Sequence, residues 1–471
     1  MKRTGISGGA FVSVLVLLVL AGNYRVLEQE VDAWAAASSA ITSTTALTEE
    51  GSQGFLYGRV TTDGGAAYVG RLRFGRDEEA FWGDYFNGSK GDNPWATHTP
   101  AGQLAEKRRP ITIFGFEIPF GEQQKLDLGR PFMARFGDIA RIEARGLRHV
   151  RVTLKSGTVF DLNRNAANDF DDGVRVWDGR GAFVDLASWA GGIPPPSRVR
   201  IRAIELLPTG QLGAVPTRLH GTVHTRQGDF SGFVQWDRQD CVGVDELGGR
   251  TSNGALSVRF DTIRSIARRS ADSSLVTLLD GREIALSGTR GVGAGNRGIY
   301  VDDLRYGRVL VSWDAFERID FSAGGSGPAY NDFARGLPLT GSVAIRGGRR
   351  LTGRLVFDLD ESETTETLDA PSQGVDYTIP FGLIASITPV GQEERGARRA
   401  KVTLHSGEEL QLDRAGDLGA GNGGMLIFID GRERPEYVQW TDIEQVEFHR
   451  PPAMYPPLGG RQRAALDELS Q

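Results

Sequence analysis

A stretch of the chain that gathers aromatic and acidic side chains is "GRDEEAFWGDYFNGSKGDNPW", residues 75–95. Exposed ring faces stack on the C–H faces of sugars, and neighbouring carboxylates accept hydrogen bonds from hydroxyl groups. The stretch therefore favours a surface that binds a glycan or a protein partner. The alternative is that the rings fill a hydrophobic core. The candidate binding residues are Phe81, Trp82, Tyr85, Phe86, Trp95, Asp77, Glu79 and Asp84.

Acidic residues recur at three comparable places, each directly after a strand-like segment. They are Asp77/Glu79, Asp237/Asp240 and Asp358/Asp360/Glu361. A glycosidase needs two carboxylates about 5–10 Å apart across a cleft. Recurrence in three places favours solvated turns over one catalytic pair, so we expect no catalytic residues and a protein that is not an enzyme. The alternative is a carbohydrate hydrolase that uses the carboxylates of residues 75–95.

Metal and cofactor motifs are weak in this sequence. The segment "NDFDDG" (168–173) and the related loops "GAGNRG" (293–298) and "GAGNGG" (419–424) contain oxygen ligands, but not in the register of a calcium loop. The segment "GVGAGNRG" (291–298) has glycines at a spacing similar to that of a dinucleotide-binding loop. It lies between two strand-like segments, whereas a dinucleotide-binding loop needs the N-terminus of a helix to hold the pyrophosphate. We expect Asx turns here, with no metal and no cofactor.

Composition limits the partners. The 471 residues carry a net charge of −6, with arginines and acidic residues interspersed, so the sequence offers no concentrated basic face and nucleic acid is an unlikely partner. The single cysteine, Cys241, excludes an intrachain disulfide. Its surroundings are typical of a half-buried thiol at the start of a strand.

The N-terminus carries an export signal. Lys2 and Arg3 precede the apolar run "AFVSVLVLLVLAG", which is typical of the hydrophobic region of a signal peptide and short for a membrane span. We expect residues 1–22 to be a signal peptide or an uncleaved N-terminal anchor, which would be the only contact with a membrane. A lead segment rich in Ser, Thr and Ala follows at 23–54. The predicted location is periplasmic, envelope-associated or secreted.

The elements that must position these residues are β-hairpins that occur in similar copies. "VTLKSGTVFDL" begins at Val152, "VTLLDGREIAL" at Val276 and "VTLHSGEELQL" at Val402. Alternating apolar residues around a turn such as Asp280-Gly281 predict a two-stranded hairpin. A catalytic motif is usually unique, so these copies indicate architecture.

A second pattern precedes each of these hairpins and defines larger units. It is a glycine-containing hairpin with the pairs Gly58/Gly70, Gly221/Gly232 and Gly341/Gly353. A Phe-x-x-Ile-x-x-Ile segment follows it each time. The predicted organisation is unit one at 55–207 with an insertion near 88–130, unit two at 218–321, unit three at 338–448 and a Pro-rich tail at 449–471. Each unit is itself read as a duplication, which gives six modules.

The order of glycines and apolar residues in "VTLLDGREIAL" and "GTVHTRQGDFSGFVQWD" resembles the Sm-like and SH3-like small β-barrels. The resemblance implies an all-β fold of tandem antiparallel β-barrel or sandwich modules that cover one another's apolar faces. A propeller-like ring of six modules is the alternative. The acidic balance argues against the RNA binding of the Sm family. We therefore expect an exported, non-enzymatic binding or scaffold protein of the cell envelope, with a protein or glycan partner.

Overall fold

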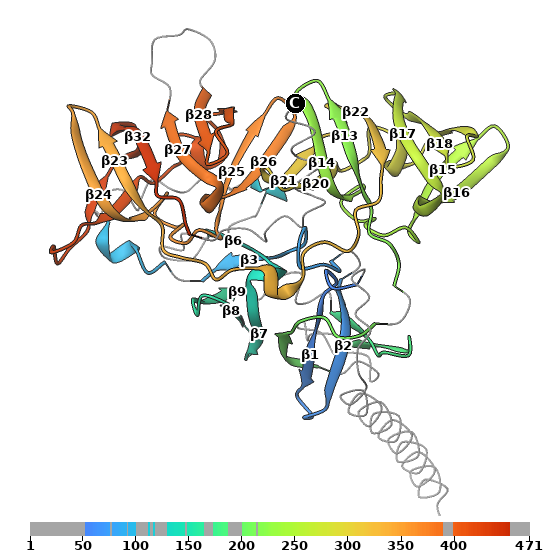
Figure 1. The fold of residues 1–471 in the computed structure, drawn as a ribbon, viewed down its shortest axis with the longest axis horizontal. Helices are drawn as coiled ribbons and strands as arrows, with labels where there is room; N and C mark the ends of the chain where they lie inside the picture. Colours follow the sequence, from blue (N-terminus) through green and yellow to red (C-terminus); the bar gives the residue numbers. More distant parts are fainter. Residues whose placement is uncertain are drawn as a thin grey trace, which may run out of the picture.

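The computed structural model describes residues 52–75, 78–91, 93–99, 112–113, 116–117, 130–146, 148–163, 173–186, 200–212, 215–389 and 399–452. These residues form an all-β protein, as predicted (Figure 1). Its large sheets are antiparallel, and its helical segments are single turns of 3-10 helix. No helix in these ranges is long and apolar enough to cross a membrane. The predicted signal segment lies outside the described residues.

The first sheet contains ten strands in the order β11-β10-β2-β1-β12-β7-β8-β9-β3-β6. The strands are β1 (Tyr57–Thr62), β2 (Ala67–Phe74), β3 (Tyr85–Lys90), β6 (Arg130–Arg135), β7 (Ile139–Arg145), β8 (His149–Leu154), β9 (Val159–Asn163), β10 (Val174–Trp177), β11 (Phe183–Leu186) and β12 (Ile201–Leu206). Two short strands, β4 (Thr112–Ile113) and β5 (Phe116–Glu117), pair with each other.

The second sheet contains twelve strands in the order β16-β15-β19-β18-β17-β22-β13-β14-β20-β21-β26-β25. The strands are β13 (His220–Thr225), β14 (Gly228–Gln235), β15 (Glu246–Thr251), β16 (Gly254–Arg259), β17 (Ile263–Ser270), β18 (Ser273–Leu278), β19 (Glu283–Ser287), β20 (Ile299–Asp303), β21 (Gly307–Val311), β22 (Phe316–Phe321), β25 (Thr367–Ser372) and β26 (Val375–Pro380).

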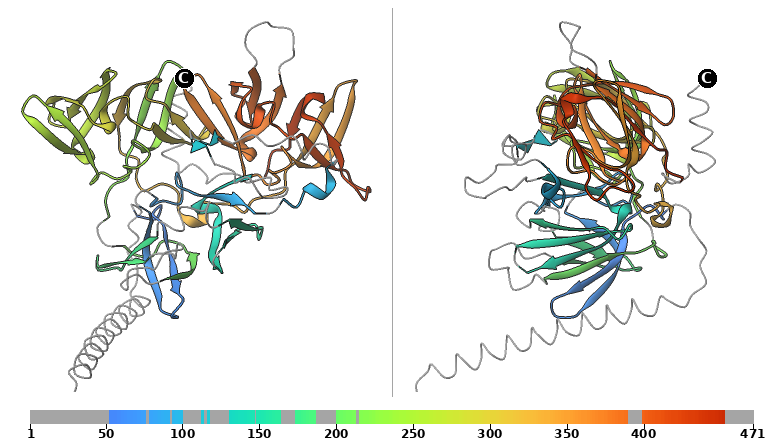
Figure 2. Two further views of the ribbon diagram at one scale, coloured as in Figure 1. Left: turned by 180° about the vertical axis from the view of Figure 1, so that it is seen from behind. Right: turned by 90° about the vertical axis from the view of Figure 1, so that its left-hand side faces the viewer.

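The third sheet contains eight strands in the order β29-β28-β27-β32-β23-β24-β30-β31. The strands are β23 (Thr340–Ile345), β24 (Arg349–Val356), β27 (Ile384–Pro389), β28 (Arg399–Leu404), β29 (Glu409–Asp413), β30 (Met425–Phe428), β31 (Glu436–Val438) and β32 (Ile443–Phe448). The hairpin β25–β26 lies between β24 and β27 in the chain, but it pairs with β21 of the second sheet. Most strands of the first sheet lie on one side of the other two sheets (Figure 2).

The same order of pairing occurs in all three sheets. In the second sheet it runs β21-β20-β14-β13-β22-β17-β18-β19, and the eight strands from β11 to β9 in the first sheet and from β31 to β29 in the third follow it. The glycine pairs face each other across the first hairpin of each set. A Cβ on Gly70 would lie 1.9 Å from the carbonyl oxygen of Trp177, and one on Gly353 would lie 2.1 Å from that of Phe428. Glycine is needed there because a neighbouring strand approaches closely.

The three predicted VTL hairpins are confirmed as β8–β9, β18–β19 and β28–β29. Their turn glycines Gly157, Gly281 and Gly407 have φ of 94°, 89° and 95°, a conformation that favours glycine. Val276 and Leu278 point into the core, with 0 % and 7 % of their surfaces exposed. Burying one such side chain stabilises the fold by about 1.5–3 kcal/mol.

The sheets differ from the predicted modules in one respect. No closed barrel and no propeller is present in the part of the chain that the structure describes. The strand β26, which lies between β24 and β27 in the chain, pairs with β21 of the second sheet through Val309↔Tyr377 and Leu310↔Asp376. The second and third sheets consequently share one hydrophobic core, whereas the first sheet has a core of its own.

Candidate functional site

Four of the five predicted binding rings are buried, and three of them, Phe81, Trp82 and Phe86, belong to the core of the first sheet. Phe81, Trp82, Tyr85 and Phe86 have only 0–2 % of their surfaces exposed. The ring of Phe81 lies 4.9 Å from that of Tyr330, which belongs to the segment between β22 and β23. The prediction of an exposed aromatic surface is therefore wrong for these four residues. Phe81 and Trp82 are covered by this later segment of the chain, whereas Phe86 on β3 packs against Phe74 and Phe136.

Trp95 has a different environment. It is half-buried, and its ring lies 5.8 Å from that of Phe428 on β30 of the third sheet. The guanidinium group of Arg354 lies over both rings, at 5.3 Å from Trp95 and 3.9 Å from Phe428. Trp95 thus contacts another part of the chain. Asp77 lies outside the described residues.

Glu79 is buried against two arginines. Its side chain is 2 % exposed and accepts ion pairs from Arg71 at 3.0 Å and Arg73 at 2.6 Å. Arg71 also lies over the ring of Trp177, at 4.0 Å. Burial raises the pKa of Glu79, and the two arginines act in the opposite direction. This carboxylate is occupied within the protein, so the arrangement gives it a structural role and no access to a polysaccharide.

Asp84 closes its own loop and also reaches the second sheet. One carboxylate oxygen accepts hydrogen bonds from the backbone N–H groups of Glu79 and Ala80, both at 2.7 Å. The other accepts a hydrogen bond from the side-chain amide of Gln235 on β14, also at 2.7 Å. A buried carboxylate that satisfies two orphan amides and a long-range donor fixes the position of both segments.

Arg308 completes this contact between the first and second sheets. Its guanidinium group lies 3.1 Å from Asp302 and 3.9 Å from Asp84. It is held between two rings, at 4.5 Å from Tyr85 and 4.3 Å from Tyr300. Burial raises the pKa of Asp302 to about 6, although Arg308 acts to lower it. We call Asp84, Gln235, Asp302 and Arg308 the Asp84 junction.

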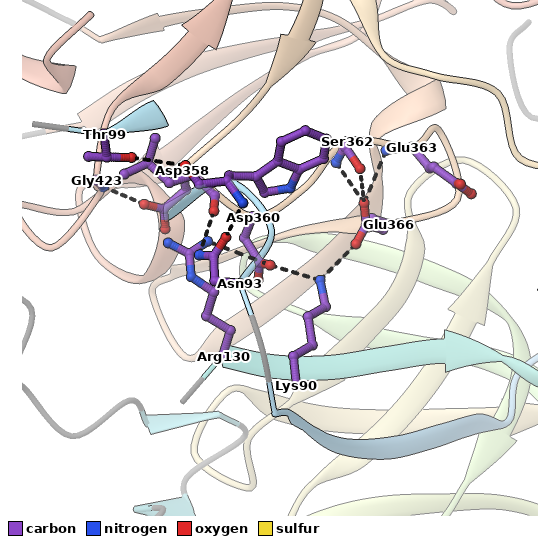
Figure 3. Close-up of polar contacts among 12 residues, drawn as sticks. Lys90, Asn93, Thr99, Arg130, Asp358, Asp360, Ser362, Glu363, Glu366 and Gly423 are labelled. Carbon is purple, nitrogen blue, oxygen red and sulfur yellow. Dashed lines mark hydrogen bonds and ion pairs between the residues drawn. The ribbon is translucent and has the colours of Figure 1, made fainter. Parts of the chain in front are cut away.

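A second buried charge cluster joins the first sheet to the loop between β24 of the third sheet and β25 of the second (Figure 3). The ammonium group of Lys90, at the end of β3, contacts Asp360 at 2.9 Å and Glu366 at 2.8 Å. Arg130, at the start of β6, lies 3.5 Å from Asp360. Burial alone would lower the pKa of Lys90, but the two carboxylates hold it above its ordinary value. We call Lys90, Arg130, Asp360 and Glu366 the Lys90 junction.

The carboxylate of Glu366 organises its loop in the same way as Asp84. Its second oxygen accepts hydrogen bonds from the backbone N–H groups of Ser362 at 2.6 Å and Glu363 at 3.0 Å. Asp245 occupies the comparable place before β15, where it accepts hydrogen bonds from two backbone N–H groups of its loop, at 2.9 and 3.0 Å. Three loops of the molecule are therefore closed by the same device.

The recurring acidic residues are less exposed than the sequence suggested. Asp237 is 5 % exposed and Asp360 is 8 % exposed, so the prediction of solvated turns is wrong for both. Asp237 forms an ion pair with Arg290 at 2.9 Å and accepts a hydrogen bond from the backbone N–H of Arg297 at 2.7 Å.

The sequence did not predict five residues of the two junctions: Lys90, Arg130, Asp302, Arg308 and Glu366. Their one signal was that carboxylates recur at matching places, which marks a common loop structure.

The loops considered for calcium are closed by their own asparagines. The side-chain oxygens of Asn296 and Asn422 each accept a hydrogen bond from the backbone N–H two residues later, at 2.8 Å. Residues 168–172 lie outside the described residues. In the ranges that the structure covers, no group of three His, Cys, Asp or Glu is placed to hold a metal ion.

Two hollows on the second sheet, of about 400 and 440 Å³, adjoin each other at Arg226. The larger one is lined by Arg226, Arg268 and Arg269. Arg226 lies 3.5 Å from Glu317, and Arg268 lies 3.4 Å from Asp314. These arginines are exposed or partly exposed and have acidic neighbours, so the hollows show no arrangement typical of general acid–base catalysis.

Comparison of the chain with models of protein families, with curated proteins and with solved structures gives no match. The function must therefore be argued from the geometry of the chain itself.

Proposed function

We propose that this chain is an exported, non-enzymatic scaffold or binding protein of the cell envelope, built from three copies of one β unit. The observation that carries the proposal is the use of the buried charges. In the described residues, the buried charges of the Asp84 junction and of the Lys90 junction join segments that lie 151 and 270 positions apart in the chain. Buried charges that connect distant segments hold the protein in one preformed structure, which is what a scaffold or binding protein presents to its partner.

The shared strand order supports three copied units. Eight strands of each of the sets β1–β12, β13–β22 and β23–β32 pair in one order, with a glycine pair at the same place and a VTL hairpin at the same place. The strands β7, β17 and β27 occupy the same place in the three sets. Each of them follows a single turn of 3-10 helix that starts with a buried phenylalanine, at Phe136, Phe260 and Phe381. Duplication explains this coincidence more simply than independent origin.

Export rests on the N-terminal sequence. Lys2, Arg3 and the apolar run up to Gly22 are the features of a secretory signal. A secreted or envelope protein with one buried thiol, Cys241, needs no disulfide chemistry to fold. The proposed partner is a protein or a glycan, bound by the outer loops and edge strands of the sheets.

Two of the carboxylates proposed for the alternative, a carbohydrate hydrolase, are buried: Glu79 and Asp84 are each 2 % exposed. The hydrolase required Glu79 and its neighbours to face a cleft, but Glu79 lies buried between Arg71 and Arg73. The geometry consequently favours the binding protein.

Export and binding can be tested in cells. Residues 1–54 fused to a phosphatase that folds only outside the cytoplasm are expected to give an active enzyme, and replacement of Lys2 and Arg3 by Glu should reduce the activity. A photo-crosslinking residue at the exposed edge-strand position 256 is expected to capture a partner in the envelope fraction. An inactive fusion together with a cytoplasmic, uncrosslinked protein would contradict the proposal.

A further inference from the structure

Units two and three are connected by a contact in which the hairpin of one unit that corresponds to β3–β6 pairs with the strand of the other unit that corresponds to β11. In unit three this hairpin is β25–β26, and β26 pairs with β21 of unit two. Tyr377 of β26 packs there against Phe230 and Tyr306, with ring centroids 6.0 and 5.7 Å apart. In this contact, β26 is the edge strand that unit three contributes, and we call it the donor strand. The strand of unit two with which it pairs, β21, is the acceptor strand.

A related contact connects units one and three. The segment that follows β3 places Trp95 against the cluster of Val356, Leu359 and Leu426, and its ring lies 5.8 Å from that of Phe428 on β30. That segment therefore contacts β30, the strand of unit three that corresponds to β10. The acceptor strand there, β31, is only three residues long.

Among the strands that pair with a single neighbour in the described residues, β16, which corresponds to the donor β26, and β11, which corresponds to the acceptor β21, carry exposed large apolar side chains. In the described residues, the donor β16 pairs only with β15, and the acceptor β11 pairs only with β10. β16 lies at the outer end of the second sheet (Figure 1). Leu256 of β16 is 38 % exposed, whereas Tyr377, at the matching place of β26, is 7 % exposed. Phe183 of β11 is 54 % exposed, whereas Arg308, at the matching place of β21, is 5 % exposed.

We propose that β16 of one copy of this chain pairs with β11 of a second copy. The inference rests on the copied units of the proposed function and names their partner. The register of the β21–β26 joint, transferred to the new pair, sets Leu256 opposite Val184 and Ser257 opposite Phe183. Pairing would cover two apolar side chains on exposed edges, which natural sheets otherwise protect with charges or prolines. Because every copy carries one donor and one acceptor, two copies can close into a dimer or continue into an array.

The register can be tested by disulfide formation between two differently tagged full-length variants, Leu256→Cys and Val184→Cys. Mixing them under mild oxidation is expected to give a crosslinked species that contains both tags. Leu279→Cys is the matched control, because Leu279 is 57 % exposed but lies on a turn rather than an edge strand. Crosslinking to Leu279→Cys at the same yield, or none with Leu256→Cys, would overturn the proposal.

The mass of the unmodified protein gives a second measurement. Light scattering is expected to show a dimer or a larger assembly, and Leu256→Lys should weaken it at least about tenfold, equivalent to about 1.4 kcal/mol. A monomer at all concentrations, or a disulfide within one chain of the double variant Val184→Cys/Leu256→Cys, would overturn the proposal. Capture of a different envelope protein at position 256 would overturn the second copy as partner while leaving the proposed function intact.

Discussion

Replacing Lys90 with methionine removes a cation that joins the first sheet to the loop between β24 and β25. The side chains of Lys90, Asp360 and Glu366 are 9 %, 8 % and 11 % exposed, so solvent cannot replace the lost ammonium group. Removing one partner of a buried ion pair costs about 3–5 kcal/mol. We expect the lower end, about 3 kcal/mol, because Arg130 still lies 3.5 Å from Asp360 and Glu366 keeps its two backbone hydrogen bonds.

The assay is urea unfolding of the full chain, followed by circular dichroism. The matched control is Lys401→Met, since Lys401 also forms an ion pair, with Glu409 at 3.0 Å, but the two side chains are 37 % and 53 % exposed. The control should cost no more than about 1 kcal/mol. Equal losses of unfolding free energy in the two variants would refute the assignment of Lys90 as a structural link.

Three further changes test the buried residues of the first two sheets. Trp82→Ala is expected to cost about 3–5 kcal/mol of unfolding free energy, because it opens a cavity in a core where Trp82 is 1 % exposed; a variant that unfolds like wild type but loses glycan binding in pull-down would restore the surface hypothesis. Glu79→Gln is expected to lower the midpoint of thermal unfolding, since it leaves two arginines facing a neutral group; loss of polysaccharide turnover without loss of stability would contradict this. Asp240→Asn is expected to stabilise the protein at pH 8 and not at pH 4. Burial, with two neighbouring aspartates, raises the pKa of Asp240 from 3.8 to about 7, so its charged form opposes folding as the pH rises through this range. Partial exposure reduces the gain to about 1–2 kcal/mol, and a pH-independent difference in urea unfolding would count against it.

Local patterns predicted the strands well. The alternation in "VTLLDGREIAL" and its turn at Asp280-Gly281 depend on neighbouring residues alone, and the structure forms that hairpin as β18–β19. The pairs Gly58/Gly70 and Gly341/Gly353 were visible as matching spacings, and the close approach of a third strand explains them. What is encoded within one hairpin could be read from the sequence.

Contacts between distant segments could not be read in this way. Phe81 and Trp82 have the composition of a binding surface, but residues Tyr330 and Phe333, some 250 positions later, cover them. Lys90 meets Asp360 across 270 positions. Composition cannot distinguish an exposed ring from a buried one, since burial is decided by the partner segment.

The most direct test of the central claim is whether the three β units unfold as one body held by the Asp84 and Lys90 junctions. Urea unfolding of the full chain is followed in parallel by circular dichroism, which reports all sheets, and by the fluorescence of the eight tryptophans, which include the buried Trp82, Trp236 and Trp440. Buried junctions predict one shared transition for both signals, which Lys90→Met splits or broadens. Separate transitions in the unmodified protein would contradict the account.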